Sequence, residues 1–186
     1  MKVYFTASIT GKKQYLPNYL TIVRHLESKG HTVQAHHILD KTESEMRLQT
    51  REDRLRFHKK LISWIQDADF MIVEASFPSI SVGYEISLAL QNRKPVLILY
   101  SEGDAPNLFA SFNDEKLVCE KYTLTSVKEL IDDFICYASG ACDTRFTFFI
   151  TPKISTFLEK ISVEQKIPKS VYLRSLIEEH ITRGSR

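Results

Sequence analysis

Glu85 is the acidic residue whose sequence position most strongly suggests chemistry. It ends the stretch "FPSISVGYE", which leads from an apolar run into a segment with helical spacing. Ser79 and Ser81 can donate hydroxyl hydrogen bonds, and a ligand can approach the backbone of Gly83 closely because glycine has no Cβ atom. Together with the unpaired N–H groups of a helix start, these residues predict a binding site for an anion.

A carboxylate beside a bound anion needs a reason, because like charges repel. We therefore interpret Glu85 as a group that acts on a neighbouring electron-poor atom, such as the anomeric carbon of a sugar. A simpler alternative stays open at this point. In that alternative Ser79 only caps the helix and Glu85 only complements the helix dipole.

A second turn of the same kind follows the first apolar run, in "TASITGKK". It places Ser8, Thr10 and Gly11 before a helical pattern, with Lys12 and Lys13 directly after them. An ordinary loop between a strand and a helix would have a similar sequence. Two such turns at strand ends of one sheet nevertheless favour a ligand site, because parallel sheets bind ligands at the carboxyl ends of their strands.

The rest of the chain indicates the framework that positions these turns. Five runs have strand character: 2–8, 31–37, 69–75, 95–101 and 116–123. The segments between and after them with helical spacing cover about 14–29, 50–67, 82–93 and 126–138. This alternation predicts an α/β fold, with a parallel five-stranded sheet of flavodoxin-like or Rossmann-like type and helices on both faces.

The pattern changes after small residues near 138–144, which indicate a linker. We therefore expect a main domain over 1–140 and a separate segment over 144–183. That segment reads as a strand followed by two helices, with Pro152 suited to the first helical turn. About 40 residues of this kind cannot bury a core alone. The segment therefore needs a second copy or the main domain.

Composition limits the classes of partner. The formal charge of +2 is too small to indicate nucleic acid or membrane binding by the whole chain, although residues 143–186 carry eight basic and five acidic side chains. The three cysteines lack CxxC spacing, which favours a reduced cytoplasmic protein without zinc. We find no secretion signal and no membrane-spanning run, and we expect no metal, cofactor or membrane partner.

The chain resembles the nucleoside 2-deoxyribosyltransferase superfamily over residues 1–138, and most closely its 2'-deoxynucleoside 5'-phosphate N-hydrolase branch. The resemblance rests on "VYFTASITG" and on "HKKLISWIQDADFMIVEASFPSISVGYEISLAL". It implies that Glu85 is the nucleophile, which attacks the anomeric carbon, forms a sugar ester and releases the base. Water or another base would then take the sugar. The resemblance also implies that Ser8 and Ser79 hold the 5'-phosphate.

Four further residues match family positions, and we interpret them as framing of the sheet and pocket: Tyr4, His37, Asp69 and Glu74. The match fails at one position that contacts phosphate. The family branch has an arginine where this chain has Thr10, so Lys12 or Lys13 would have to replace it. A flexible ammonium group is a poor substitute for a planar guanidinium.

The second departure concerns the leaving base. The family carries an aspartate that assists its departure eight residues before the position of Asp69, and here that residue is Leu61. A leucine can neither bind a hydroxyl group nor carry a proton. His58, Glu52 and Asp53 lie nearby as replacements, and the simpler alternative is that they are solvated helix residues.

The C-terminal segment resembles a ribbon-helix-helix module, in which two chains pair their single strands. If Phe146, Phe148 and Ile150 face the core, the outward side chains are those of Arg145, Thr147 and Phe149. This is a poor set for reading DNA bases, so DNA binding and simple dimerisation are equal alternatives. Either one predicts a homodimer or a higher even-numbered oligomer.

Our leading hypothesis is an N-glycosidase, either hydrolase or transferase, that acts on nucleoside 5'-monophosphates or related nucleotides. Glu85 would be catalytic, and the substrate-binding residues would be Ser8, Thr10, Gly11, Ser79 and Gly83. The alternatives are a nucleotide-sensing DNA-binding regulator and an assembly subunit, each with a weakly active or inactive pocket. Leu61 and the C-terminal segment favour the regulator, and the intact "SVGYE" favours the enzyme.

Overall fold

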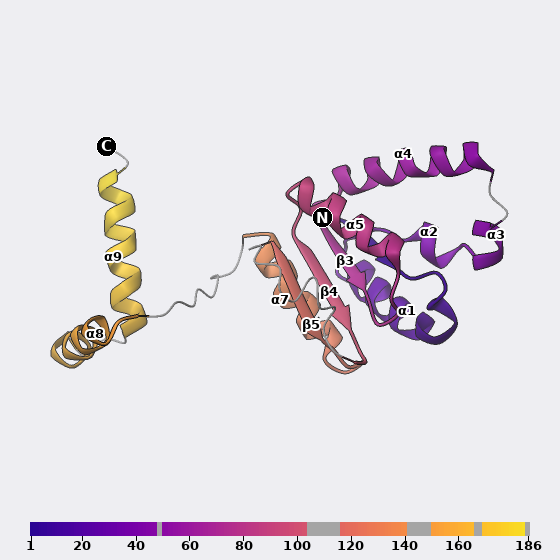
Figure 1. Ribbon diagram of the computed structural model, residues 1–186. Helices are drawn as coiled ribbons and strands as arrows, with labels where there is room; N and C mark the ends of the chain where they lie inside the picture. The colour runs from indigo at the N-terminus through magenta and orange to yellow at the C-terminus, as the bar shows by residue number, and fades with distance from the viewer. Residues whose placement is uncertain (48–49, 104–115, 141–149, 166–168, 185–186) are drawn as a thin grey trace. The chain divides into compact units, whose positions relative to one another are not determined.

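The chain divides into two compact units, Met1–Thr144 and Arg145–Arg186, and each is described by itself. The computed structural model describes all residues except 48–49, 104–115, 141–149, 166–168 and 185–186 (Figure 1).

A parallel five-stranded sheet forms the centre of the first unit. Its strands are β1 (Lys2–Ala7), β2 (Thr32–Gln34), β3 (Phe70–Glu74), β4 (Val96–Tyr100) and β5 (Leu117–Lys121). They lie in the order β2-β1-β3-β4-β5, and every neighbouring pair is parallel. All residues of β3 are buried, and those at 70–73 are apolar, as expected for a strand that is covered on both faces. The predicted fold class is confirmed.

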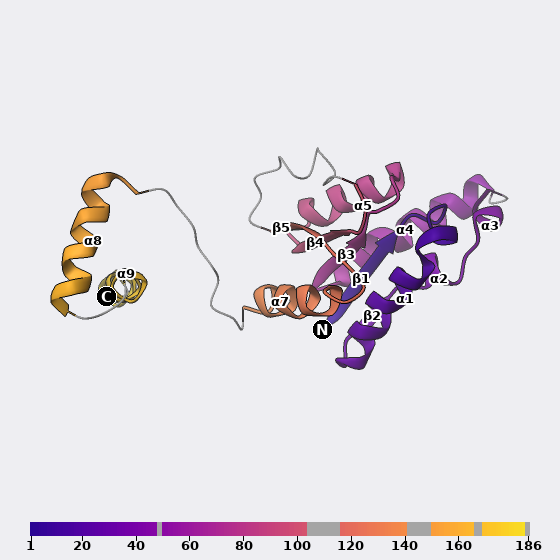
Figure 2. The same ribbon diagram turned by 90° about the horizontal axis from the view of Figure 1, so that it is seen from below.

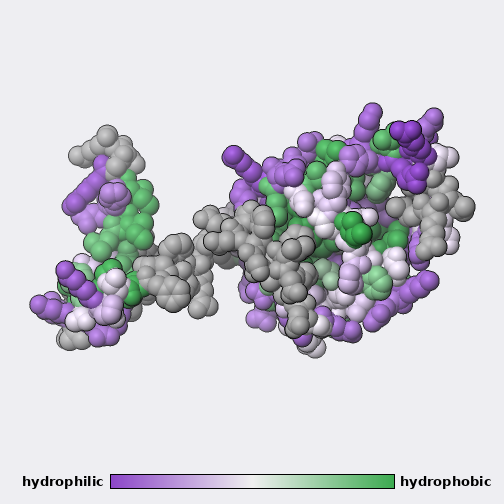
Figure 3. All heavy atoms as spheres, in the orientation of Figure 1, coloured by the Kyte–Doolittle hydropathy of each residue, from purple (hydrophilic) through white to green (hydrophobic). Residues whose placement is uncertain are grey.

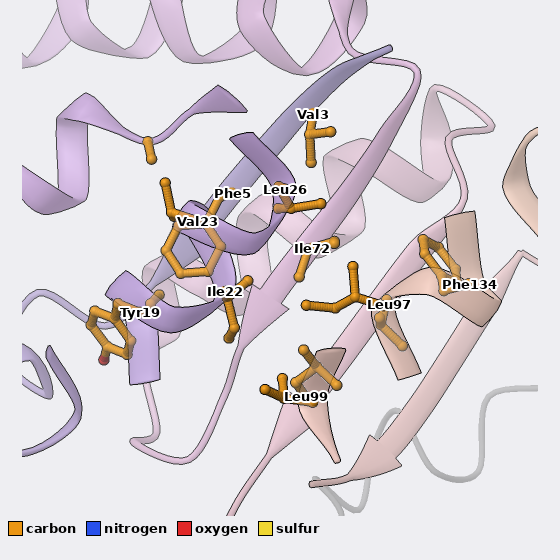
Figure 4. Packing of buried hydrophobic residues seen from close by; sticks show 14 of the residues in the cluster. Val3, Phe5, Tyr19, Ile22, Val23, Leu26, Ile72, Leu97, Leu99 and Phe134 are labelled. Atoms are coloured by element: carbon orange, nitrogen blue, oxygen red, sulfur yellow. The ribbon is translucent and has the colours of Figure 1, made fainter. Parts of the chain in front are cut away.

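Helices cover both faces of this sheet. The helices α1 (Lys12–Ser28) and α7 (Val127–Ala138) pack on one face, and α4 (Arg51–Asp67) and α5 (Ile80–Gln91) pack on the other (Figure 2). Figure 4 shows Phe5, Ile22, Leu97 and Phe134 in the apolar layer under α1 and α7. Because side chains alternate along a strand, Tyr4 belongs to the opposite layer, under α4 and α5.

The strand order creates a crevice where the candidate residues lie. After β1 the chain turns outward to β2, and after β3 it turns the other way to β4, so the two loops diverge at the carboxyl ends of neighbouring strands. Gly11, in the loop after β1, packs against Phe77 in the loop after β3. A Cβ atom there would lie 2.5 Å from Cβ of Phe77 and 3.0 Å from the hydroxyl oxygen of Tyr19. Gly11 therefore lets the two loops pack in contact.

The structure corrects the sequence prediction between β2 and α4. The strand expected over 31–37 ends at Gln34, and two short helices follow, α2 (His36–Leu39) and α3 (Glu43–Arg47). Helices of four and five residues are too short to show helical periodicity in a sequence.

Two helices, α8 (Pro152–Gln165) and α9 (Lys169–Gly184), form the described part of the second unit. Pro152 is the first residue of α8, as predicted. Large apolar side chains are exposed on both helices, including Phe157, Leu176 and Ile177, and Figure 3 shows apolar side chains gathered along α9. Most of the predicted ribbon, including Arg145, Thr147 and Phe149, lies outside the described residues, so its role stays a prediction.

The cysteines differ from the prediction. Cys119 is a free thiol, but Cys136 is disulfide-bonded. The prediction of a wholly reduced protein is therefore wrong, because an odd number of cysteines still allows one pair and one free thiol. Among the described residues, no helix is long and apolar enough to cross a membrane.

Candidate active site

A cavity of about 630 Å³ lies at the carboxyl ends of β1 and β3. It is bounded by the loop after β1, by α2, by one face of α4 and by the start of α5. Its lining residues are Ala7, Ser8, Ile9, Thr10, His37, Ile38, Arg54, Phe57, His58, Leu61, Ser79, Ile80, Ser81, Val82, Tyr84 and Glu85. Both predicted turns therefore contribute to one site.

Glu85 is the buried carboxylate of this cavity. Its side chain is only 5% exposed, and the Tyr4 hydroxyl donates a hydrogen bond of 2.9 Å to Oε2. Burial raises the pKa of Glu85 from 4.5 to about 7, although the hydroxyls of Thr6 and Tyr4 act to lower it. An ionised carboxylate that is so poorly solvated gains stability from any positive charge that develops beside it. Glu85 is therefore suited to react with an electron-poor carbon.

Tyr4 and His37 form a chain that ends on this carboxylate. The Tyr4 hydroxyl lies 2.9 Å from Nε2 of His37, and the two rings stack with centroids 5.1 Å apart. Because the single hydroxyl hydrogen of Tyr4 goes to Glu85, His37 must donate from Nε2. Burial lowers the pKa of His37 from 6.5 to about 4, so this imidazole is neutral at pH 7. We interpreted both residues as framing, but the structure connects them to Glu85.

Ser8 and Ser79 line the cavity, and the Oγ atom of each accepts a hydrogen bond from a backbone N–H. Oγ of Ser8 accepts a hydrogen bond of 3.2 Å from the Gly11 N–H. Ser79 is the N-cap of α5, and its Oγ accepts from the Val82 N–H at 3.5 Å. Capping leaves each hydroxyl hydrogen available for a ligand. The capping and ligand-binding interpretations of Ser79 are therefore compatible.

The two predicted glycines are placed differently. Neither Gly11 nor Gly83 is among the lining residues of the cavity. Gly11 has the packing role described above, and a Cβ atom on Gly83 would meet nothing within 4 Å. Their contact with substrate stays a prediction.

The cation in the cavity wall is not one that we predicted. Lys12 donates to the carbonyl oxygens of Leu39 and Lys41, and the side chain of Lys13 is 86% exposed. Neither lysine lines the cavity, whereas Arg54 of α4 does. Arg54 lies in the charged run "REDRLRFHKK", which suggested a solvated helix. Its spacing from His58 and Leu61, four and seven residues further on, was the signal that these three share a helix face.

Of the three residues considered as replacements near Leu61, the structure brings His58 into the site. Leu61 is buried in the cavity wall, and His58 lines the wall one turn earlier. Nε2 of His58 lies 2.8 Å from the Tyr84 hydroxyl. Asp53 belongs to the capping box that begins α4, and Glu52 does not line the cavity.

Asp69 and Glu74 lie outside the cavity. Asp69 accepts a hydrogen bond of 2.8 Å from the Lys2 N–H at the opposite end of the sheet. Glu74 is fully buried at the end of β3, on the face under α1 and α7, where the Tyr122 hydroxyl donates to it at 3.0 Å. Their positions agree with a framing role.

Fold and cavity define the class of protein, an α/β domain with a buried carboxylate at a small-ligand site. No family profile matches the chain. It is 39% identical over 101 residues to 2'-deoxynucleoside 5'-phosphate N-hydrolase 1 of Methanococcoides burtonii, covering 54% of this chain and 80% of the relative. It is 31% identical to the protein of that name from Nematostella vectensis, and the match covers 72% of this chain and 92% of the relative.

A third relative is the 5-hydroxymethyl-dUMP N-hydrolase of Tetraodon nigroviridis, 30% identical over 72% of this chain and 96% of that protein. The solved structure of a 2-deoxyribosyltransferase from Bacillus psychrosaccharolyticus shares the fold, with a TM-score of 0.53 and 20% identity over 69% of this chain and 90% of that one. The chain belongs to the 2'-deoxynucleoside 5'-phosphate N-hydrolase family.

The raised pKa of Glu85 predicts how stability depends on pH. The folded protein binds this proton more tightly than the unfolded chain does, so wild type loses stability as pH rises from 4.5 through about 7. The loss amounts to about 3 kcal/mol. Glu85→Gln stays neutral, so its melting temperature should exceed that of wild type by several degrees at pH 8 and much less at pH 4.5. Calorimetry at both pH values checks this, and an equal difference at both would contradict it.

Proposed function

We propose that the protein hydrolyses the bond between base and sugar in 2'-deoxynucleoside 5'-monophosphates, with Glu85 as the nucleophile. The observation that carries the proposal is the buried Glu85 carboxylate, which lines one cavity with the hydroxyls of both serine turns. The names of the relatives support the reaction and substrate class, and they favour water over a second base as the acceptor.

The reaction would proceed in two displacements on C1' of the sugar. An oxygen of ionised Glu85 bonds to C1' while the electron pair of the glycosidic bond leaves with the base. Because Tyr4 occupies Oε2, the other oxygen, Oε1, is the one left to bond. Water then attacks C1' of the sugar ester and restores the carboxylate. The positive charge that develops on the sugar is stabilised by the poorly solvated carboxylate beside it.

The 5'-phosphate would lie against the two turns. Ser8, Thr10 and Ser79 supply hydroxyl donors, and the first N–H groups of α5 add the positive end of the helix dipole. Arg54 would supply the full positive charge that Thr10 does not. In this arrangement the phosphate binds at the start of α5, whereas Glu85 lies in the second turn of the same helix, so the two negative charges are kept apart.

The test is release of free base from a panel of 2'-deoxynucleotides, ribonucleotides and the matching nucleosides, followed by chromatography. Wild type should favour the 5'-monophosphates, and Glu85→Gln should lose at least about a thousandfold in kcat. Arg54→Ala should lose about tenfold or more of the preference for monophosphate over nucleoside. Glu27→Gln, on the exposed side of α1, is the matched control and should match wild type.

Absence of base release from every compound would contradict the proposal, as would full activity of the Glu85→Gln variant.

We also propose that the second unit joins two copies of the chain. Phe157, Leu176 and Ile177 are 50%, 42% and 61% exposed, which is unfavourable for apolar side chains in a unit of this size. A second copy would bury them and give an even-numbered oligomer. The alternative role of this unit in DNA binding depends on residues outside the described ones, and no contact in the described part favours it.

Light scattering of the full chain tests this pairing. Wild type should be a dimer or a higher even-numbered oligomer, and Ile177→Glu should shift the mass toward the monomer, because it places a charge in the apolar contact. His180→Glu adds the same side chain at another exposed position of α9 and should keep the wild-type mass. A monomeric wild type, or an unchanged mass for Ile177→Glu, would contradict the proposal.

A further inference from the structure

The proposed reaction needs a proton donor for the leaving base. A nucleobase leaves poorly as an anion, so its ring nitrogen must take up a proton as the bond to C1' breaks. Leu61 cannot supply one from the cavity wall. Arg54 also lines the cavity, but a guanidinium does not release its proton in proteins.

Two histidines line the cavity, and their surroundings separate their functions. His37 is buried and neutral, and its Nε2 proton is held by Tyr4 on the side of the nucleophile. His58 is exposed at the cavity wall, so its imidazole is accessible both to solvent and to a ligand in the cavity. Histidine is the side chain that most often exchanges protons near neutral pH. His58 is therefore the available donor among the described lining residues.

The contact with Tyr84 holds this histidine in place. Nε2 of His58 lies 2.8 Å from the Tyr84 hydroxyl, and the two rings stack at 5.8 Å with an angle of 24° between their planes. Tyr84 directly precedes Glu85 on α5, whereas His58 belongs to α4. The contact therefore links the imidazole on α4 to the residue next to Glu85 on α5.

We propose that His58 is the general acid that protonates the departing base, with Tyr84 as its positioning residue. This inference rests on the proposed function. As the glycosidic electron pair moves to the base, the protonated imidazole of His58 gives one proton to a base nitrogen and becomes neutral. In the second step the neutral imidazole takes a proton from the attacking water, while C1' leaves Glu85. One cycle consumes one water molecule and returns both side chains to their starting states.

The experiment compares two substrates that differ in their need for this proton, 2'-deoxyguanosine 5'-monophosphate and its 7-methyl derivative. The methylated base is already positively charged and leaves as a neutral molecule. In a single turnover, which isolates the first displacement, His58→Gln should slow base release from the unmethylated nucleotide by about 10²–10⁴-fold and change release from the methylated one little, after subtraction of the uncatalysed rate. Tyr84→Phe should show the same selective pattern with a smaller loss.

Two controls separate this inference from the proposed function. Glu85→Gln should lose activity on both nucleotides, and Lys59→Gln, which neighbours His58 outside the cavity lining, should keep both. If wild type releases no base from either nucleotide, the proposed function fails and this inference with it. If wild type and Glu85→Gln behave as proposed but His58→Gln slows single-turnover base release from both nucleotides equally, or from neither, the role of His58 alone is overturned.

Discussion

The burial of one carboxylate, that of Glu85, is the constraint on which the rest of the site depends. An ionised group at 5% exposure is costly unless polar partners or a ligand compensate it. In the described part of the chain the hydroxyls of Tyr4 and Thr6 lower the pKa of Glu85, but burial outweighs them and raises it to about 7. This poor solvation favours a reaction, because positive charge that develops on a substrate can then stabilise the ionised carboxylate.

The sheet explains why this carboxylate meets the right neighbours. The side chains of Tyr4, on β1, and Ser8, in the loop after it, lie on the same side of the sheet. Helix α5 packs on that side, with the side chain of Glu85 buried beneath it. The connections after β1 and β3 run to opposite sides of the sheet, which opens the crevice, and the missing Cβ of Gly11 lets the two loops pack against each other at Phe77. A stable apolar core and a reactive polar edge are thus built from the same strands.

Much of this arrangement was predictable from sequence, for local reasons. Fully buried strands read as apolar runs, and a cap followed by a carboxylate is a short-range pattern, so the fold, Ser79 and Glu85 were accessible. The chain from His37 through Tyr4 was missed because it joins residues 33 and 81 positions apart, which only the packing of α2 and α5 on β1 brings together. Arg54 was hidden in a charged run, where facing solvent and facing a cavity look alike, and for the same reason the sequence could not choose among His58, Glu52 and Asp53. The disulfide at Cys136 was excluded too readily from a count of three.

The most direct test of the central claim is to trap the sugar on the enzyme. Wild type mixed with 2'-deoxynucleotide, quenched in acid within milliseconds to seconds and digested, should show a peptide spanning 80–91 with the added mass of a deoxyribosyl phosphate, and fragmentation should place it on Glu85. The adduct should disappear at the rate at which free sugar phosphate forms. An adduct on another residue, or base release with no adduct at any time, would contradict the account of Glu85 as the nucleophile.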